Sequence, residues 1–443
     1  MSDAPIVEPS GEVSRYPRTR LPKSHKPKKA PVVTDSSSPR LVSLDAYRGL
    51  IMMALAASGF GIAQLARLPE SAPIWTVFDY KIWQQIGFHF THPEWASDFQ
   101  TMGVAFWDLI QPAFMFMVGV SMPYSYSRRE EQGSSGPGMF FHAVCRAVIL
   151  VLLGVFLQSQ NTDKTNWVFV NVLSQIGLGY VFLYLCLRRK FVVQLIIFVL
   201  ILGGYWGYFK TYTPAEDYDY ASVSAAPATV YEGNFASWSK NANAAHEFDV
   251  WFLNQFPQPG DSDFTHNGGG YLTLNFVPSI ATMLLGLMAG QLLRTPRSWW
   301  KKTGSLILAG GVCMGLAILA GEFACPIVKR IWTPSWVLFS GAYVLWMLAV
   351  FYFLFDVLPF RWLAFPLAIV GMNSIAMYLM GQMMRPWTIR VVRTHFAETI
   401  ETVANVPLFD DQWYGHITYP TAAFLVFWLI ALWLYRNRYF IRI

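Results

Sequence analysis

Long apolar runs constrain this chain more than any other feature of its sequence. Several stretches of about 20 residues carry few or no charges, and each is long enough to cross a bilayer core of about 30 Å as a helix. Only 14% of the 443 residues are charged, whereas a soluble domain carries about 25%. We therefore predict an all-α, polytopic helical membrane protein in a lipid bilayer.

The hydrophobic pattern and the loop charges together predict the topology. We place ten spans, at residues 43–66, 102–122, 141–158, 166–187, 191–209, 272–293, 303–320, 335–356, 362–384 and 418–435. Loops such as L-R-R-K at 187–190 are basic, whereas alternate loops hold most of the acids. Because basic loops stay inside, both termini are predicted to face the cytoplasm.

The segments outside the spans divide the chain. Residues 1–38 are rich in Pro, Ser and Lys and are predicted to be a disordered cytoplasmic tail without a signal peptide, which favours a bacterial cytoplasmic (inner) membrane. Residues 39–443 form the membrane domain, with extracytoplasmic loops at 67–101, 210–271 and 385–417. Loop 210–271 is either a folded cap over a site or a floppy exterior loop. Loop 385–417 begins like an amphipathic interfacial helix.

Several common sites find no support in the sequence. The four cysteines form no C-x-x-C pair and are interpreted as buried apolar residues. No H-E-x-x-H is present, so we predict no metal. The formal charge of +6 is accounted for by the cytoplasmic loops, so no nucleic acid partner is expected.

Two histidines precede the second span, in I-G-F-H-F-T-H-P-E-W-A at 86–96. The topology puts His89 and His92 at the outer membrane interface. Each is either an ordinary interfacial histidine or a general base, because an imidazole titrates near neutral pH.

Ionisable residues inside spans are few and are candidates for function. Asp108, about two turns into its span, has no Lys or Arg within a turn, so it needs a partner from another segment or a water-filled cavity. The nearby Gln111 suggests a polar pocket, and a structural hydrogen bond is the alternative. Asp45 and Arg48, three apart, form either an intrahelical ion pair or a site for an anionic cytoplasmic ligand.

Further polar residues are embedded in the spans. They are Asn171, Ser174, Gln175, Asn275, Ser279, Thr282, Asn373 and Ser374. Such residues either form hydrogen bonds between helices or line one cavity.

Five groups of motifs occur in order between residues 40 and 443. They are R-L-V-S-L-D-A-Y-R-G-L at 40–50, H-P-E-W at 92–95 followed by D-L-I-Q-P-A-F-M-F-M-V-G at 108–119, V-L-S-Q-I-G at 172–177, N-F-V-P-S-I-A-T-M-L-L-G-L-M-A-G at 275–290, and G-M-N-S-I-A-M-Y at 371–378. Together they resemble the heparan-alpha-glucosaminide N-acetyltransferase family and its bacterial relatives, predicted transmembrane acyltransferases.

The resemblance implies an acyltransferase that moves an acetyl group from cytoplasmic acetyl-CoA to an amino sugar or glycan at the extracytoplasmic face. The family's catalytic histidine corresponds to His92, and Asp108 orients it or binds the pantetheine arm. Asp108, Asn275 and Asn373 would share one cavity. The residues assigned to substrate or acetyl-CoA binding are Asp45, Arg48, Gln111, Asn171, Gln175, Asn275, Asn373 and Ser374.

Three points stay open. Ser174-Gln175 replaces the family's Gln-Arg, so sugar amine, sugar hydroxyl and lipid-linked glycan are all possible acceptors. A membrane transporter or flippase of a small envelope metabolite also suits ten spans with polar residues in mid-membrane, although no repeat relates the two halves. G-L-M-A-G at 286–290 packs helices within the chain or forms a homodimer.

Overall fold

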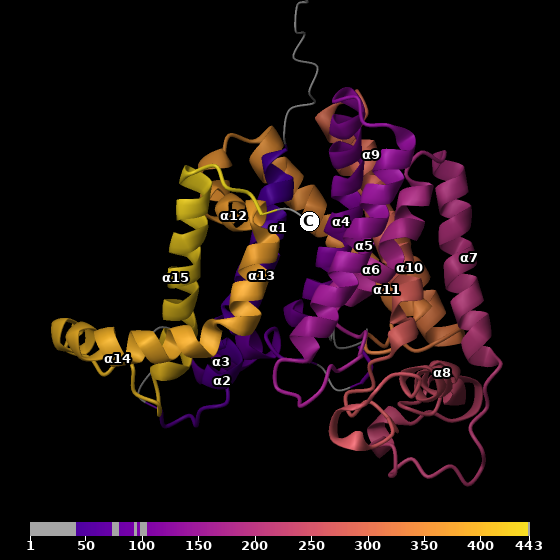
Figure 1. Cartoon of the computed structure of the whole chain (residues 1–443), viewed down its shortest axis with the longest axis horizontal. Helices are drawn as coiled ribbons and strands as arrows, with labels where there is room; N and C mark the ends of the chain where they lie inside the picture. Colours follow the sequence, from indigo (N-terminus) through magenta and orange to yellow (C-terminus); the bar gives the residue numbers. More distant parts are fainter. Residues whose placement is uncertain (1–40, 73–78, 93–94, 98–103, 442–443) are drawn as a thin grey trace, which may run out of the picture. The chain divides into compact units, whose positions relative to one another are not determined.

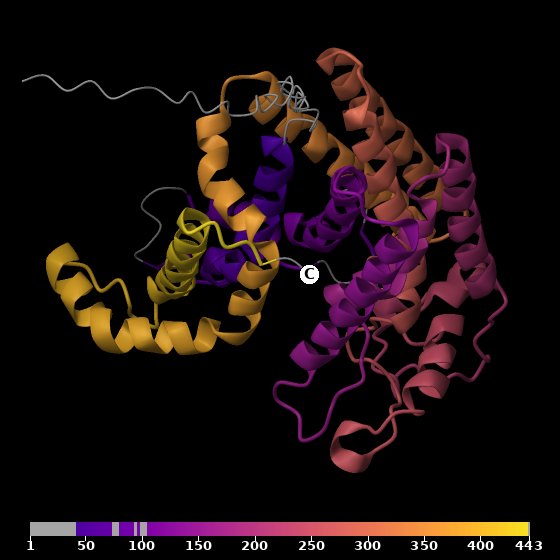
Figure 2. The same cartoon turned by 45° about the horizontal axis from the view of Figure 1, so that its top comes forward.

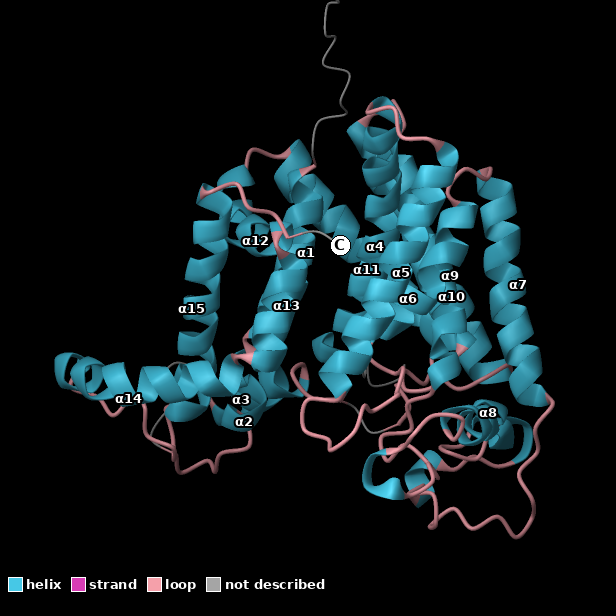
Figure 3. Cartoon of the chain, viewed as in Figure 1, coloured by secondary structure: helices cyan, strands magenta, loops and turns pink. Residues whose placement is uncertain are grey.

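The structure, a computed structural model, describes residues 41–72, 79–92, 95–97 and 104–441. The predicted tail 1–38 lies outside these residues. Within them the chain forms helices joined by loops and turns, with no β-strand (Figure 3). Since several of these helices are long and apolar, the prediction of an all-α polytopic membrane protein is confirmed.

Every predicted span corresponds to a helix, but not every helix is a straight span. In the described part of the chain, six helices have the length and apolarity to cross a membrane. They are α5 (Gly136–Gln158), α7 (Phe191–Lys210), α9 (Phe276–Arg294, extended by the 3₁₀ turn Thr273–Asn275), α10 (Trp299–Phe323), α11 (Pro334–Tyr352, extended by the π-helical turn Phe353–Val357) and α15 (Gly415–Arg436). The number of spans and the sides of the termini remain predictions.

Two predicted spans are bent pairs instead. The first joins α1 (Val42–Ala56) to Ser58–Leu65, which contains α2 (Ile62–Leu65), with a bend of 54°. The second joins α12 (Arg361–Met372) to α13 (Ser374–Met383) with a bend of 68°. The first break is explained by positive φ values, such as +62° at Gly59. Non-helical dihedrals at Asn373 make the second.

Two further helices lie in predicted spans but are not among those with the length and apolarity to cross a membrane. α4 runs from Phe106 to Glu131 and starts the second predicted span. α6 runs from Val172 to Cys186, shorter than predicted because the preceding residues are not helical and Asn171 caps the helix. The Asn171 side chain accepts a hydrogen bond from the Leu173 N–H at 2.8 Å.

Close backbone contact holds two of the helix pairs together. A Cβ atom at Gly286 of α9 would lie 2.0 Å from the Phe116 carbonyl oxygen of α4, and one at Gly49 of α1 would lie 1.8 Å from the Leu367 oxygen of α12. Figures 1 and 2 show α1 beside α12 and α13 in both views. The G-L-M-A-G motif therefore packs helices within the chain, as one of the two alternatives predicted.

The start of α1 is held by a carboxylate from another helix. The π-helical turn after α11 carries Asp356, whose two oxygens accept hydrogen bonds from the backbone N–H groups of Val42 and Ser43 at 3.0 and 3.1 Å. These N–H groups have no partner inside the helix, and the positive end of the helix dipole favours the negative charge.

The loops predicted to be cytoplasmic gather at one end of the helices, which we call the basic end (loops 132–135, 187–190, 295–298 and 358–360) (Figure 1). Side chains also connect the end of α4 to neighbouring segments there. Arg188 pairs with Glu130, and Arg294 donates to the Pro123 carbonyl and the Ser127 hydroxyl, both at 2.8 Å.

The opposite end, which we call the cap end, is formed by residues 79–92, 95–97, 211–271 and 324–333. Residues 211–271 are folded, as one of the two predicted alternatives required. The segment contains α8 (Ala244–Leu253), and its Trp238 stacks on Phe209 of α7 with ring centroids 4.4 Å apart. The buried Asn241 side chain donates to the carbonyls of Val223 and Asn267 at 2.8 and 2.9 Å.

Two other helices lie in predicted loops. α3 (Tyr80–Phe88) was not expected from the sequence. α14 (Arg385–Ala404) follows α13 and confirms the helix predicted at the start of loop 385–417. Figures 1 and 2 show α14 lying crosswise to α13 and α15.

Candidate active site

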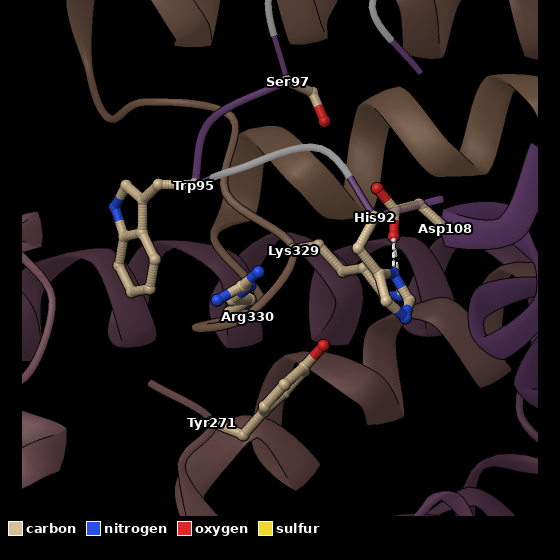
Figure 4. A pocket seen from close by; sticks show the side chains of 7 residues that line it. All are labelled: His92, Trp95, Ser97, Asp108, Tyr271, Lys329 and Arg330. Atoms are coloured by element: carbon tan, nitrogen blue, oxygen red, sulfur yellow. Dashed lines mark hydrogen bonds and ion pairs between the residues drawn. The ribbon is translucent and has the colours of Figure 1, made fainter. Parts of the chain in front are cut away.

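His92 is held against the start of α4 by the turn that follows α3. The Trp107 N–H of α4 donates to the His89 carbonyl at 2.9 Å, which fixes the turn to the helix. His92 Nδ1 then lies 2.7 Å from an Asp108 carboxylate oxygen (Figure 4). Asp108 is in the first turn of α4 rather than two turns inside it, because the helix begins at Phe106.

Asp108 is buried and has a second partner from a distant segment. Lys329 Nζ, in the loop between α10 and α11, lies 2.8 Å from the same carboxylate oxygen and 3.5 Å from His92 Nδ1. The partner that the sequence required for Asp108 therefore comes from another part of the chain. A carboxylate between a cation and an imidazole is stabilised in its charged form.

This arrangement selects the state of the His92 ring. A carboxylate only accepts hydrogen bonds, so His92 Nδ1 must donate to Asp108. In the neutral imidazole the lone pair is then on Nε2. The His92 side chain is 43% exposed, whereas that of Asp108 is 5% exposed. The ring thus offers a basic nitrogen to incoming molecules while its other nitrogen is fixed from behind.

Residues from three other segments line the same pocket. They are Trp95, Ser97, Tyr271, Lys329 and Arg330. Figure 4 shows the Tyr271 side chain reaching from the folded cap with its hydroxyl directed into the pocket. The Arg330 guanidinium lies over the Tyr271 ring, 5.9 Å from its centroid, and donates to the Gly269 carbonyl at 3.1 Å.

The segments that line the pocket are bound to one another. The Ser97 N–H donates to the Ile327 carbonyl at 2.8 Å, which ties the segment after His92 to the α10–α11 loop. Gly270 has a φ of +75°, and a Cβ there would lie 2.6 Å from the Trp95 ring. A glycine is needed at this position both for the backbone conformation and for the contact.

Two of the predicted binding residues support the pocket walls. The Asn275 side chain donates to the Arg330 carbonyl at 2.7 Å. The Gln175 side chain donates to the carbonyls of Phe169, Thr273 and Leu272 at 3.0, 3.3 and 3.4 Å. Both therefore hold backbone next to Arg330 and Tyr271, and neither is among the residues that line the pocket.

The structure does not bring Asn373 to this pocket. Its side chain lies at the α12–α13 break, donates to the Tyr439 carbonyl at 3.3 Å and accepts from the Ile441 N–H at 3.0 Å. Ser374 follows it as the first residue of α13. Both hydrogen bonds tie residues near the end of the described chain to the α12–α13 break, where the interrupted helix leaves polar groups without partners inside the helix.

The remaining predicted residues are spread over other contacts. Asp45 and Arg48 form the expected intrahelical pair at 3.9 Å, and Arg48 also donates to Ser121 of α4. Asn171 donates to the Tyr378 hydroxyl at 3.2 Å. Gln111 is half-buried on α4, three residues after Asp108.

Lys329, Arg330 and Tyr271 were not predicted from the sequence as site residues. A signal for the first two existed in A-C-P-I-V-K-R-I-W-T-P at 324–334. Two adjacent cations in a predicted outer loop contradict the preference of basic residues for the cytoplasmic side, so they need another reason to be there. Tyr271 carried no comparable signal.

The folded cap is also hydrogen-bonded to the backbone that precedes α9, close to Tyr271. The buried Asp249 of α8 accepts a hydrogen bond from the Thr273 N–H at 2.9 Å, at the start of the 3₁₀ turn that leads into α9. Burial raises the pKa of the Asp249 carboxyl to about 7, against the opposing effect of that hydrogen bond. Burial, with a contribution from His266, lowers the pKa of the neighbouring His246 to about 4.

No candidate metal site is present in the parts of the chain that the structure describes. No group of three or more His, Cys, Asp or Glu side chains is arranged there to hold an ion. The four cysteines are unpaired thiols, and Cys186, Cys313 and Cys325 are buried.

Comparisons with known proteins show that the chain has distant relatives. No protein-family model matches the chain. The human heparan-alpha-glucosaminide N-acetyltransferase is 22% identical over 91% of this chain and 60% of its own length. The mouse protein of the same name is 22% identical over 85% of this chain and 59% of its own length. The chain is thus distantly related to these proteins and spans about three fifths of their length.

Proposed function

We propose that this chain is an integral-membrane acetyltransferase. In this proposal acetyl-CoA, supplied from the cytoplasm, donates an acetyl group to an amino sugar or glycan at the extracytoplasmic face. The observation that carries the proposal is the contact of an exposed imidazole with a buried, cation-paired carboxylate, His92–Asp108–Lys329. The distant relationship to two N-acetyltransferases supports the same reaction class.

His92 is the proposed general base. As an acceptor amine attacks the thioester carbonyl, a C–N bond forms and the C–S bond breaks. The amine proton passes to His92 Nε2 and from there to the departing thiolate. A positioned base of this kind contributes about 10²–10⁴-fold to a rate. A second route, in which Nε2 itself carries the acetyl group between the two substrates, uses the same atom.

Asp108 is the proposed positioning residue for His92. It holds the ring so that Nε2 faces the pocket, and its charge stabilises the imidazolium that forms when the proton is taken. Lys329 in turn compensates the buried carboxylate. Asp108 therefore acts through His92 and does not need to touch the acceptor.

The remaining assignments follow the geometry. Tyr271 and Arg330 line the pocket and are proposed to contact the acceptor. Asn275 and Gln175 position the backbone of that wall. Asp45, Arg48, Gln111, Asn171 and Ser374 stay proposals for donor or substrate contacts, whereas Asn373 is proposed to hold the backbone of Tyr439 and Ile441. The proposed location is a bacterial inner membrane, with the cap end facing out.

The test is acetyl transfer by purified, detergent-solubilised protein, with radiolabelled acetyl-CoA and a panel of amino sugars. The variant His92→Ala should lose transfer by about 100-fold or more. His89→Ala is the matched control, because it removes an imidazole from the same turn outside the pocket. Near-normal transfer by a folded His92→Ala variant would refute the role of His92.

A membrane transporter or flippase is the second candidate. The observation that favours it is the pair of bent spans, α1–α2 and α12–α13, since broken helices that pack together are common in transporters. The two candidates differ in a covalent step. A transporter leaves its substrate unmodified and consumes no acetyl-CoA, so CoA release that depends on an acceptor excludes it.

A further inference from the structure

A second polar cluster lies at the basic end, where α4, α5 and α6 meet, and the proposed reaction does not use it. Arg129 of α4 donates to His142 Nε2 of α5 at 2.8 Å, so the proton of the neutral ring is on Nδ1. That Nδ1 is buried without a hydrogen-bond partner. The same is true of Arg146 Nε, one helical turn further along α5, whereas the Tyr126 hydroxyl of α4 has the Tyr180 side chain of α6 as a partner.

Contacts between the side chains show that these groups form one cluster. The Tyr126 and His142 rings are 6.3 Å apart at an angle of 81°. The Arg146 guanidinium lies 4.8 Å from the centroid of the Tyr180 ring of α6. His142 and Arg146 share a face of α5, because residues four apart are neighbours on a helix.

The cluster carries positive charge that no carboxylate compensates. Within the described residues, neither Arg129 nor Arg146 has an Asp or Glu oxygen within 4.0 Å, whereas Arg188 at the same end pairs with Glu130. Two partly buried guanidiniums and a buried imidazole N–H without an acceptor are costly for an empty site. An anion with several oxygen acceptors offers partners to these donors.

The surroundings indicate which anion fits. On both helices the neighbouring residues face outward and are apolar, with Phe141 of α5 69% exposed and Phe182 of α6 55% exposed. In a chain that spans a bilayer, such side chains contact acyl chains. A ligand that places its charge on the arginines and its apolar part on these phenylalanines is an amphiphile with an anionic head.

We infer that Arg129, His142 and Arg146 bind the phosphate of an anionic phospholipid in the leaflet at the basic end. Arginine binds phosphate through several donors in fixed geometry. Basic pockets between membrane helices on the cytoplasmic side are suited to such headgroups, and the many basic loops at this end raise the local concentration of anionic lipid. The inference does not depend on the proposed acetyl transfer.

The experiment measures lipid binding to the full chain in phosphatidylcholine nanodiscs, with and without phosphatidylglycerol. Bound phosphatidylglycerol is quantified by native mass spectrometry, and thermal stability is followed in parallel. We expect phosphatidylglycerol to bind and to raise the melting temperature. Arg146→Gln and Arg129→Gln should each weaken binding about 10-fold or more, since each removes hydrogen bonds to a charged group.

Two further variants separate the site from general charge and from misfolding. Arg128→Gln removes the same charge from the adjacent, exposed position and should bind as the parent chain does. His142→Gln keeps an acceptor for Arg129 but removes the buried Nδ1–H, so it should fold, yet lose part of the stabilisation by phosphatidylglycerol.

Two results would overturn the inference. One is equal weakening by Arg128→Gln and Arg146→Gln, which would mean that only the overall charge matters. The other is displacement of the lipid by inorganic phosphate, or stabilisation by phosphate alone, which would assign the cluster to a soluble anion instead.

Discussion

At the cap end, the Asp108 carboxylate accepts hydrogen bonds from two side chains, His92 and Lys329, which come from different segments. At the basic end, the Asp356 carboxylate accepts hydrogen bonds from two backbone N–H groups at the start of α1. Both acids join distant parts of the chain. Only the first holds an imidazole ring, and that ring is exposed to incoming molecules.

The difference indicates how a carboxylate in a membrane protein can be classified. A carboxylate that accepts hydrogen bonds from a helix N-terminus stabilises that helix and orients no reactive side chain. An acid that holds one side of an exposed imidazole determines which nitrogen reacts. We therefore expect substitution of Asp108 to affect acetyl transfer and substitution of Asp356 to affect the stability of the fold.

The largest difference should come from the isosteric variants Asp108→Asn and Asp356→Asn. Asp108→Asn removes the charge that orients His92 and leaves Lys329 buried without its counter-ion, so acetyl transfer should fall about 100-fold or more. Asp356→Asn should leave transfer per folded molecule unchanged and lower stability by about 1–2 kcal/mol. Transfer rates and melting curves for both variants check this, and equal losses of transfer would contradict the comparison.

The next largest effect concerns the cation at the cap end. Lys329→Met keeps the apolar length of the side chain but leaves Asp108 without its positive partner. Breaking a buried ion pair costs about 3–5 kcal/mol, so the melting temperature should drop markedly. The double variant Lys329→Met, Asp108→Asn should recover part of this loss. If the double variant were less stable than either single one, the pair would not be coupled in this way.

A smaller effect is expected from pH, through the folded cap. The pKa of Asp249 is raised to about 7, so the folded state binds its proton more tightly, and stability falls as pH rises from about 4 to 7. The pKa of His246 is lowered to about 4, so its contribution rises with pH between about 4 and 6.5. In the parent chain the two slopes oppose each other.

Asp249→Asn should remove one of these slopes. Its stability should then rise by about 1–3 kcal/mol between pH 4.5 and 6.5, since only the His246 contribution remains. Melting temperatures across this interval measure the change. A parent chain and a variant with the same pH profile would show that Asp249 does not titrate in the folded cap.

The smallest effect should separate two asparagines that the sequence suggested were equivalent. Asn275→Ala removes the bond to the Arg330 carbonyl and should lower transfer several-fold at a stability cost of about 1 kcal/mol. Asn373→Ala, which loses bonds to the backbone of Tyr439 and Ile441, should have a similar stability cost and leave transfer by the folded protein unchanged. A larger loss of transfer in Asn373→Ala would return that residue to the proposed site.

The helices could be predicted from the sequence because apolar length and loop charge act locally. Each predicted span has a helix, and α14 was expected from its composition. The bends were not predicted, because the glycines near Gly59 and the break at Asn373 lie within apolar runs whose hydropathy hides them.

The candidate site could be predicted only in part. His92 and Asp108 are 16 positions apart in the chain and are in contact, and both drew attention as titratable groups beside or within an apolar run. Lys329 is 221 positions from Asp108, and nothing local links them. Only the unusual position of Lys329-Arg330 in an outer loop hinted at a role. The sequence motifs suggest one cavity for Asn275 and Asn373, because residue type and motif do not indicate at which end of the fold an asparagine lies.

The separation between Asp108 and Lys329 also has a consequence for biosynthesis. A ribosome adds about 5–20 residues per second, so the 221 positions between the two residues take roughly 10–40 s to translate. During that time α4 enters the membrane with its carboxylate, while the lysine that compensates it does not yet exist. The ion pair closes only after α5 through α10 have been synthesised. Its formation is therefore a late step in assembly, and truncated chains that end before the α10–α11 loop cannot form the pocket.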